Sequence, residues 1–287
     1  MNTELAPIDF MKLHGSGNDF VVIDNRCGIL AESRLSEFSE LVSRRARSIG
    51  ADGVVLIENP VEPDTDFRWR YFNADGSEGE MCGNGAMCGA RFAALIGAAS
   101  ADAAFSTMSG IVRATVDPET GLVELAMPDT GPIEKPRTVE ADGNSYELIP
   151  IQVGVPHAVL YVEDADAFAD RAALERIGRA IRRAEVFAPA GTNVNFVSPL
   201  GENRLRMRTY ERGVEAETLA CGTGAVASAV VSAGRGMVTA PVEIVTSSGM
   251  PLVASFDLRQ NGARTVTLRG QTRIVMSGTI RVDALAR

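Results

Sequence analysis

The amino-acid sequence predicts an α/β fold of the α+β type. Two pseudo-symmetric domains are expected, each a mixed or antiparallel sheet closed around one buried helix. The pattern Cys-Gly-polar-Gly-Ala occurs at residues 82–86 and again at 221–225. Each copy leads into a run of small apolar residues, which is typical of a helix buried nearly all round. The length of 287 residues also suits two domains of roughly 150 residues each.

A nearly constant offset links further landmarks of the two halves. A shift of 139 residues places Cys221 on Cys82 and His157 on Asn18. The same shift aligns two more pairs, Tyr210 with Tyr71 and Glu217 with Glu78. Ordered repetition of this kind indicates two copies of one fold.

The domain boundaries follow from this repeat. We expect the first domain at residues 1–128 and the second at 129–270. A tail of residues 271–287 is expected to return to the first domain. The connection between the copies is placed at 131–144, because this segment is rich in Pro, Glu and Gly.

Local patterns predict the elements of each half. Runs of β-branched or alternating apolar residues indicate strands, and apolar residues at helical spacing indicate helices. The first half is expected to contain strand 20–23, helix 36–48, strands 54–58 and 67–73, buried helix 86–99, and a hairpin of 107–116 and 121–127. The second half is expected to contain strands 146–153 and 158–162, helix 165–187, strands 194–197 and 204–210, buried helix 222–234, and strands 242–246, 252–257, 265–268 and 272–277.

The composition excludes several classes of protein. A net charge of −9 argues against a nucleic-acid surface and against binding to an anionic membrane. Four cysteines are too few for a disulfide framework, and two histidines make a metal site unexpected. Because we see neither a signal peptide nor a run of 18 apolar residues, we expect a cytoplasmic protein.

Cys82 and Cys221 are the candidate catalytic residues. A cysteine just before a helix lies at the positive end of the helix dipole, which lowers the pKa of its thiol. The glycines that follow each cysteine let backbone N–H groups approach an anion closely. Two such helix starts that face each other across a cleft could hold one carboxylate and present one thiol to each side of the adjacent carbon.

This arrangement predicts inversion at the α-carbon of an amino acid. One thiolate removes the α-proton, and the opposite thiol delivers a proton to the other face. The negative charge that develops on the substrate carboxylate is stabilised by the N–H donors. Neither pyridoxal phosphate nor a metal ion is required, so no cofactor is expected.

Each cysteine needs a neighbour that adjusts its protonation. His157 is the candidate for Cys82, and Glu211 is the candidate for Cys221. Glu211 and Arg212 could also bind the ammonium and carboxylate groups of a substrate. The alternatives are a hydrogen-bonded core histidine and a surface ion pair worth at most about 1 kcal/mol.

The chain closely resembles the diaminopimelate epimerase family. The resemblance runs in family order from Lys12 to Gly224. It rests on the motifs KLHGSGNDFVVID, IGADG, FNADGSEGEMCGNG, GVPH, GTNVNF and YERGVEAETLACGTG. The family interconverts LL- and meso-diaminopimelate without pyridoxal phosphate, on the route to lysine and peptidoglycan.

The resemblance implies a role for each matching residue. Cys82 and Cys221 would be the acid–base pair, supported by His157 and Glu211. The residues that would hold the reacting carboxylate are Gly83, Asn84, Gly222 and Thr223. The residues that would recognise the distal amino-acid end are Asn18, Asn73, Asn193, Glu211 and Arg212. The chain departs from the family at Val155, where many members have Asn, so one amide contact to the distal end is absent. We expect a small-molecule substrate and a homodimer.

Two alternatives remain open from the sequence. A proline or hydroxyproline racemase has a related two-cysteine architecture. Asn84, in place of the histidine usual there, and the pair Glu211-Arg212 speak against it. The other alternative is a non-catalytic amino-acid-binding or redox-sensing protein of the same fold, which would bind a ligand without exchanging its α-proton.

Overall fold

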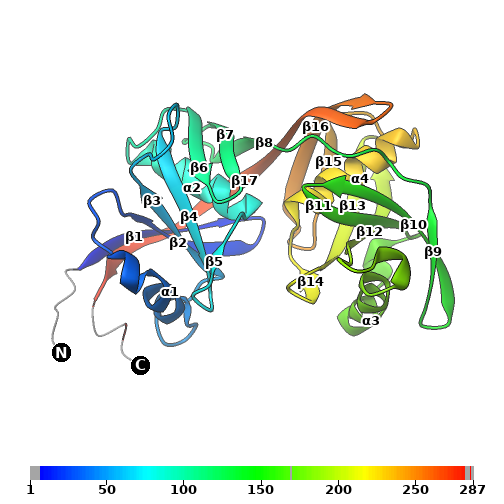
Figure 1. Ribbon diagram of the computed structural model, residues 1–287, viewed down its shortest axis with the longest axis horizontal. Coiled ribbons are helices and arrows are strands. Elements are labelled where there is room, and N and C mark those ends of the chain that lie inside the picture. Colours follow the sequence, from blue (N-terminus) through cyan, green and yellow to red (C-terminus); the bar gives the residue numbers. More distant parts are fainter. Residues whose placement is uncertain (1–6, 169, 282–284, 286–287) are drawn as a thin grey trace. The chain divides into compact units, whose positions relative to one another are not determined.

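The computed structural model describes residues 7–168, 170–281 and 285. The chain divides into two compact units (Figure 1). The first extends to Leu125 and resumes at Gly270, and the second comprises Ala126–Arg269. In the described part of the chain, no helix combines the length and the apolar character needed to cross a membrane.

The first unit consists of short strands around one central helix. Its elements are β1 (Ile8–Gly15), β2 (Asn18–Asp24), the 3-10 helix η1 (Glu32–Arg34), α1 (Leu35–Ser43), β3 (Gly53–Glu58), β4 (Phe67–Asn73), β5 (Glu78–Gly79), α2 (Gly83–Leu95), β6 (Asp102–Thr107), β7 (Gly110–Val116) and β8 (Leu122–Ala126). β2 pairs parallel with β3, and β4 pairs parallel with β6. The pairings β1–β2, β3–β4, β4–β5, β6–β7 and β7–β8 are antiparallel.

The second unit repeats this plan. Its elements are β9 (Arg137–Ala141), β10 (Asn144–Val153), β11 (Val155–Tyr161), η2 (Ala165–Ala167), α3 (Arg171–Arg182), η3 (Glu185–Phe187), β12 (Asn193–Gly201), β13 (Arg204–Glu211), β14 (Ala216–Thr218), α4 (Gly222–Gly234), β15 (Val242–Val245), β16 (Pro251–Arg259) and the first part of β17 (Gly262–Ile280), which continues into the first unit. β11 pairs parallel with β12, and β13 pairs parallel with β15. The pairings β10–β11, β12–β13, β13–β14 and β15–β16 are antiparallel. Elements from β10 to β16 thus follow the order and strand direction of β1 to β7.

A buried helix fills the centre of each unit. The continuous runs Asn84–Ala93 in α2 and Gly224–Ser232 in α4 are buried. Their side chains are mostly small, so strands can pack against several faces of the helix. The predicted fold class, two α+β units that each surround a buried helix, is confirmed.

Three predicted elements were wrong in extent. The expected helix 165–187 is broken into η2, α3 and η3. Asp164 caps the start of η2, and Asp170 accepts a hydrogen bond as a second N-cap and begins α3 as a separate helix. The expected helix 36–48 ends at Ser43, where the backbone turns extended at Arg44. The expected connection 131–144 contains β9, which pairs with β10.

The last strand is longer than the pattern indicated. The segments 265–268 and 272–277, expected as separate strands, belong to the single strand β17. β17 contributes residues to both units, because the division falls between Arg269 and Gly270. Its final part pairs antiparallel with β1, from Ile280 opposite Ile8 to Thr272 opposite Gly15.

A bidentate ion pair closes the hairpin ahead of each central helix. In the first unit, Arg70 Nε and Nη2 lie 2.7 and 2.9 Å from the two carboxylate oxygens of Glu78. In the second unit, Arg208 makes the same contacts to Glu217 at 2.7 and 2.8 Å. The Glu217 side chain is only 8% exposed. Burial raises the pKa of Glu217, but the hydrogen bonds from Arg208 and Ser247 and the positive charges of Arg208 and Arg171 together outweigh this effect. The net pKa therefore lies below its usual value.

We expect the substitution Glu217→Gln to destabilise the protein by about 3 kcal/mol at neutral pH, because it leaves the Arg208 charge buried without its counterion. The folded-state pKa of Glu217 is depressed. The stabilisation is therefore complete above the unfolded-state pKa of about 4.3 and is lost as the pH falls through the folded-state pKa. The difference from wild type, measured by urea unfolding, should shrink below about pH 4.

Glu243→Gln is the matched control, because Glu243 pairs with Arg204 at 2.6 Å in the same unit but is 39% exposed. Its expected loss is below about 1 kcal/mol. Equal losses in the two variants at neutral pH would contradict the importance given to burial of the Arg208–Glu217 pair.

Candidate active site

The two predicted catalytic cysteines occupy equivalent positions in the two units. Cys82 is the N-cap residue of α2, and its sulfur accepts a hydrogen bond from the Gly85 N–H at 3.4 Å. Cys221 is the N-cap residue of α4, and its sulfur lies 3.6 Å from the Thr223 hydroxyl. Both have extended backbone conformations, as N-cap residues usually do. Each sulfur therefore lies where the unpaired N–H groups of a helix begin.

The glycine that follows each cysteine has different surroundings. A Cβ atom at Gly83 would meet nothing within 4 Å, so the backbone there borders open space. A Cβ atom at Gly222 would meet Leu268 at 3.0 Å. Access to the N–H groups is therefore more open at the start of α2 than at the start of α4.

Amide side chains connect the start of α2 to a charged network. Asn84 Nδ2 donates to Asn18 Oδ1 at 2.7 Å, and Asn18 Nδ2 donates to Asp52 Oδ2 at 3.2 Å. Arg45 Nη2 in turn contacts Asp52 Oδ1 at 2.9 Å. The structure thus brings the predicted residues Asn18 and Asn84 together beside Cys82. The carboxylate of Asp52 determines which end of the Asn18 amide faces Asn84.

Asn73 lies at the end of β4, in the turn that leads to β5. Its amide nitrogen donates to the Ser77 hydroxyl at 3.0 Å. That hydroxyl donates in turn to the carboxylate of Asp75. Hydrogen bonds therefore connect the polar side chains of this turn, and the Asn73 side chain is half-buried.

His157 lies at the centre of a buried polar cluster in the second unit. The His157 side chain is 1% exposed, and Nδ1 lies 3.2 Å from Nδ2 of Asn195. Asn195 Oδ1 accepts a hydrogen bond from the Thr209 hydroxyl at 3.0 Å. A Cβ atom at Gly224 would lie 2.5 Å from the same Oδ1, so Asn195 also packs against the first turn of α4. Burial, with a smaller effect of the Arg212 charge, lowers the pKa of His157 to about 3.

Glu211 and Arg212 follow the end of β13. The Glu211 carboxylate accepts a hydrogen bond from the Thr218 hydroxyl at 2.8 Å. Burial raises the pKa of Glu211, and the bond from Thr218 opposes this only in part. The backbone N–H of Arg212 donates to Asn193 Oδ1 at 2.8 Å. These contacts hold Glu211, Arg212 and Asn193 in one region of the second unit.

The predicted site residues fall into two groups, one in each unit. The first unit contains Asn18, Asn73, Cys82, Gly83 and Asn84, and the second contains His157, Asn193, Glu211, Arg212, Cys221, Gly222 and Thr223. The predicted support of Cys221 by Glu211 involves residues of one unit. The predicted support of Cys82 by His157 involves residues of different units and stays a prediction.

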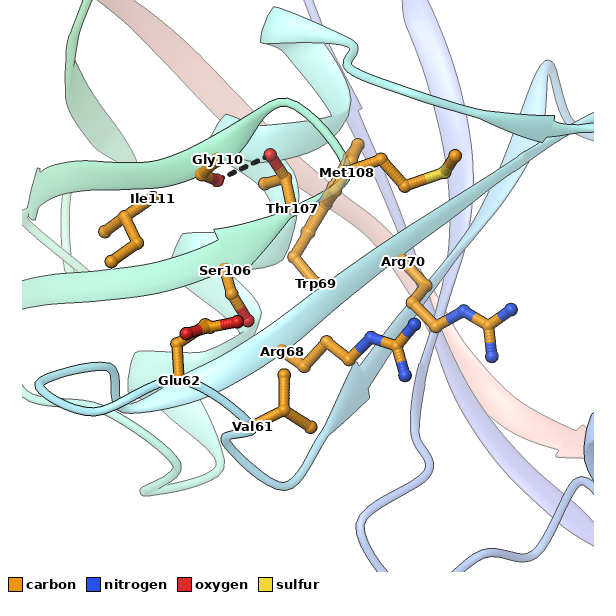
Figure 2. Close-up of a pocket in the computed structure, with 10 residues that line it drawn as sticks. All are labelled: Val61, Glu62, Arg68, Trp69, Arg70, Ser106, Thr107, Met108, Gly110 and Ile111. Carbon is orange, nitrogen blue, oxygen red and sulfur yellow. Dashed lines mark hydrogen bonds between the residues drawn. The ribbon is translucent and has the colours of Figure 1, made fainter.

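Figure 2 shows a pocket in the first unit, whose volume is about 440 Å³. Residues of β4, β6 and β7 contribute to its lining, and none of the predicted site residues does. Trp69 lines it and donates from Nε1 to the Gly85 carbonyl at 3.3 Å, which links the pocket wall to the first turn of α2. No three histidine, cysteine or acidic side chains converge as a metal site in the part of the chain that the structure describes.

Sequence reasoning missed four residues next to the predicted site: Asp52, Asn195 and Thr218, which bond to predicted site residues, and Thr209, which bonds to Asn195. A signal was present for two of them. Asn195 follows Asn193 by two positions on one strand, and buried polar side chains in a strand usually have a specific partner. Asp52 aligns with Asn193 when the second half is shifted back by 141 residues, close to the shift of 139 that aligns the cysteines. The threonines carried no comparable signal.

Comparison with known proteins gives consistent matches along the chain. A model of the diaminopimelate epimerase family matches residues 10–134 and 150–278. A diaminopimelate epimerase of Aquifex aeolicus strain VF5 is 44% identical, and the match covers 97% of this chain and 99% of that protein. A diaminopimelate epimerase of Hydrogenobaculum sp. strain Y04AAS1 is 38% identical, over 95% of this chain and 98% of that protein.

A solved structure that is distant in sequence has a similar fold. A probable proline racemase from Agrobacterium radiobacter K84, with bound carbonate, matches with a TM-score of 0.68 and 16% identity. The match covers 96% of this chain and 93% of that chain. At this identity the similarity shows the fold alone.

We expect the substitution Gly224→Ala to destabilise the protein by about 1 to 3 kcal/mol, because the added methyl group would overlap Asn195 Oδ1 in a packed interior. Gly83→Ala is the matched control, since Gly83 lies in the first turn of the equivalent helix and has space for a methyl group. Its stability should stay within about 1 kcal/mol of wild type. Thermal unfolding of both variants measures the contrast, and a Gly224→Ala variant as stable as Gly83→Ala would contradict the described contact.

Proposed function

The chain belongs to the diaminopimelate epimerase family, and on this premise we propose that it converts LL-2,6-diaminopimelate to the meso form by a two-thiol reaction without a cofactor. The sequence-based predictions of this family and of an isomerase are confirmed by the relatives. The reaction would serve the biosynthesis of lysine and peptidoglycan. The observation that carries the proposal is the pair of cysteines that cap the equivalent central helices.

The proposed reaction moves one proton off the α-carbon and another onto it. The thiolate of one cysteine takes the α-proton, and the electron pair of the broken C–H bond delocalises into the adjacent carboxylate. The thiol of the other cysteine then donates its proton to the opposite face of the carbon. The enzyme ends with the protonation states of Cys82 and Cys221 exchanged, and the reverse reaction uses them in the opposite order.

The starts of α2 and α4 are proposed to bind the reacting carboxylate. The N–H groups at a helix start have no partner within the helix and lie at the positive end of its dipole. Gly83, Asn84, Gly222 and Thr223 belong to these first turns. Donors placed where negative charge develops stabilise the transition state more than the ground state.

The distal amino-acid end of the substrate is proposed to bind amide and charged side chains. Glu211 would bind the ammonium group and Arg212 the carboxylate, which it can contact with two hydrogen bonds. Asn18, Asn73 and Asn193 would add amide contacts. Two of these amides are already oriented, Asn18 by Asp52 and Asn193 by the backbone of Arg212. Val155 offers no such contact.

His157 and Glu211 are proposed to support the two cysteines, His157 for Cys82 and Glu211 for Cys221. Burial raises the pKa of Glu211, so its carboxyl group binds a proton more readily than an exposed glutamate does. Such a group can exchange a proton with a neighbouring thiol. Glu211 is hydrogen-bonded to Thr218, which precedes Cys221 by three residues.

Two features favour the diamino diacid over proline as the substrate. Asn84 stands where a proline racemase usually has a histidine. Glu211 and Arg212 offer charged groups that a proline ring would leave unused. A similar fold in a probable proline racemase does not decide between these substrates. A non-catalytic binding protein would have no need for two cysteines at equivalent helix starts.

We further propose that the protein is a homodimer of the cytoplasm with a small-molecule substrate and no nucleic-acid partner. Three consecutive apolar side chains of β17, Ile274, Val275 and Met276, are 43%, 55% and 50% exposed. Contiguous exposed apolar residues are typical of an interaction surface. Cys27 and Cys88 form no disulfide, which suits a reducing compartment.

In deuterated water, the reduced protein should incorporate α-deuterium into LL-diaminopimelate and yield the meso product, followed by NMR. Cys82→Ala and Cys221→Ala should each lower the rate of epimerisation by at least about a thousandfold, because each removes one of the two proton carriers. Cys27→Ala is the matched control, since Cys27 is exposed, and it should keep the wild-type rate.

Each other outcome of this experiment has a definite meaning. Exchange on proline without exchange on the diamino diacid would assign the protein to the racemase alternative. No exchange on any amino acid, with the thiols intact, would favour the binding-protein alternative. Wild-type epimerisation by either cysteine variant would contradict the two-thiol reaction.

Mild oxidation should join Cys82 to Cys221 and abolish activity, if both sulfurs act on one carbon atom. Peptide mass mapping should identify the bond, and a thiol reductant should restore the activity. The Cys221→Ala variant serves as the control for the assignment, because it cannot form the bond. Full activity after complete formation of the bond would refute the proposed role of the two thiols.

A further inference from the structure

The hydrogen bonds around His157 determine which of its ring nitrogens can carry a proton. We propose that Asn195 and Thr209 are positioning residues that keep the ring proton of His157 on Nε2. His157 would then act as a permanent hydrogen-bond donor to an anion and not as a proton acceptor. This inference rests on the proposed function, in which His157 supports a catalytic cysteine, and it specifies how that support works.

The orientation of the Asn195 amide is the first step of the argument. Its oxygen accepts from the Thr209 hydroxyl at 3.0 Å, so its nitrogen is directed to the other side. Both side chains are buried, at 0% and 1% exposure, and water does not compete for these bonds. Asn195 and Thr209 are also directly opposite each other in the β12–β13 ladder, which fixes their separation.

The protonation of the imidazole ring follows from this orientation. Asn195 Nδ2 lies 3.2 Å from His157 Nδ1, and an amide nitrogen can only donate. Nδ1 must therefore accept and carries no proton. A neutral imidazole has one N–H group, so the proton of His157 lies on Nε2.

The protonated Nε2 of His157 is a hydrogen-bond donor, and it has no acceptor among the described residues. This atom is also buried. A buried donor without a partner costs about 1 to 3 kcal/mol, so such a group is rarely retained unless something else binds it. An anion that arrives with the reaction, such as a thiolate, would satisfy it.

The ring is also unsuited to take up a second proton. Burial and the nearby positive charge of Arg212 lower the pKa of His157 to about 3. The groups that pack around the ring from the neighbouring strands, Asn193 on β12 in parallel register with His157 and Asn195 two residues on, are uncharged amides. No carboxylate in the described residues counters the effect of Arg212 on His157.

As a chemical consequence, His157 and the thiols would have different roles in the proton transfer. An Nε2–H group next to a sulfur stabilises the thiolate and so lowers the pKa of the thiol. It cannot remove the thiol proton, because Nε2 already holds one and Nδ1 is covered by Asn195. Protons would then pass between sulfur and carbon, while His157 keeps its own.

The test is nitrogen NMR of the histidine rings, which reads the tautomer directly. The chain has only two histidines, and the His14→Gln variant identifies the signals of His157. In ¹⁵N-labelled protein without substrate, we expect an unprotonated Nδ1 and a protonated Nε2 from about pH 5 to about pH 9. A proton on Nδ1, or a cationic ring near neutral pH, would overturn the proposal without any variant.

Two variants test the positioning roles. Asn195→Asp replaces the donor to Nδ1 by an acceptor, so the proton should move to Nδ1 and the ring should titrate near neutral pH. Thr209→Val removes the hydroxyl that orients the amide, so signals of both tautomers should be present. Asn144→Asp, an exposed asparagine of the same unit, is the matched control and should leave the His157 signals unchanged. Wild-type signals in Asn195→Asp would refute its positioning role.

The activity of Asn195→Asp provides a readout that separates this role from simple packing. We expect kcat to fall about 10- to 100-fold, as for other residues that orient a functional group, and its pH profile to gain a step at the new pKa of His157. A fall in kcat with an unchanged pH profile would assign Asn195 to packing alone. Because the tautomer is read without substrate, failure of the epimerisation assay would refute the proposed function and leave the tautomer result separately decided.

Discussion

The bidentate arginine–glutamate ion pair that closes the hairpin ahead of each cysteine is the constraint on which the site depends. β5 and β14 are only two and three residues long, so their few backbone hydrogen bonds contribute little to the stability of the two hairpins. Arg70 and Arg208 each bind the glutamate of that short strand through two nitrogens. The cysteine follows the glutamate by four residues in both units. The ion pair thus fixes the short strand from which the chain continues to each cysteine.

The fold repeats, but the chemistry around the two cysteines differs. In the first unit, Asn18 contacts a carboxylate and an amide, Asp52 and Asn84. At the position that the repeat aligns with Asn18, the second unit has His157. The same backbone site thus presents an amide in one unit and an imidazole in the other. The two cysteines therefore have different hydrogen-bonding neighbours, although the backbone around them repeats.

The repeated fold and the cysteines at the helix starts could be predicted from the sequence, because both depend on local patterns that occur twice. The break at Asp170 was missed, since an aspartate inside an apolar periodicity can lie on the exposed face or cap a new helix. The sequence carried a signal for Asp52 and Asn195, but the partners of these residues and of Thr209 could not be predicted, because they depend on strand register. Asn195 meets Thr209 only through the pairing of β12 with β13, and a shift of one residue would separate them.

The path of β17 has a consequence for biosynthesis. Its final residues pair with β1, so strands at opposite ends of the chain share one ladder. A chain emerging from the ribosome would expose one edge of β1 until residues 272–280 are available. The second unit, Ala126–Arg269, lies wholly before that point. The first unit, whose other strands are synthesised first, is therefore completed only after the whole second unit has been synthesised.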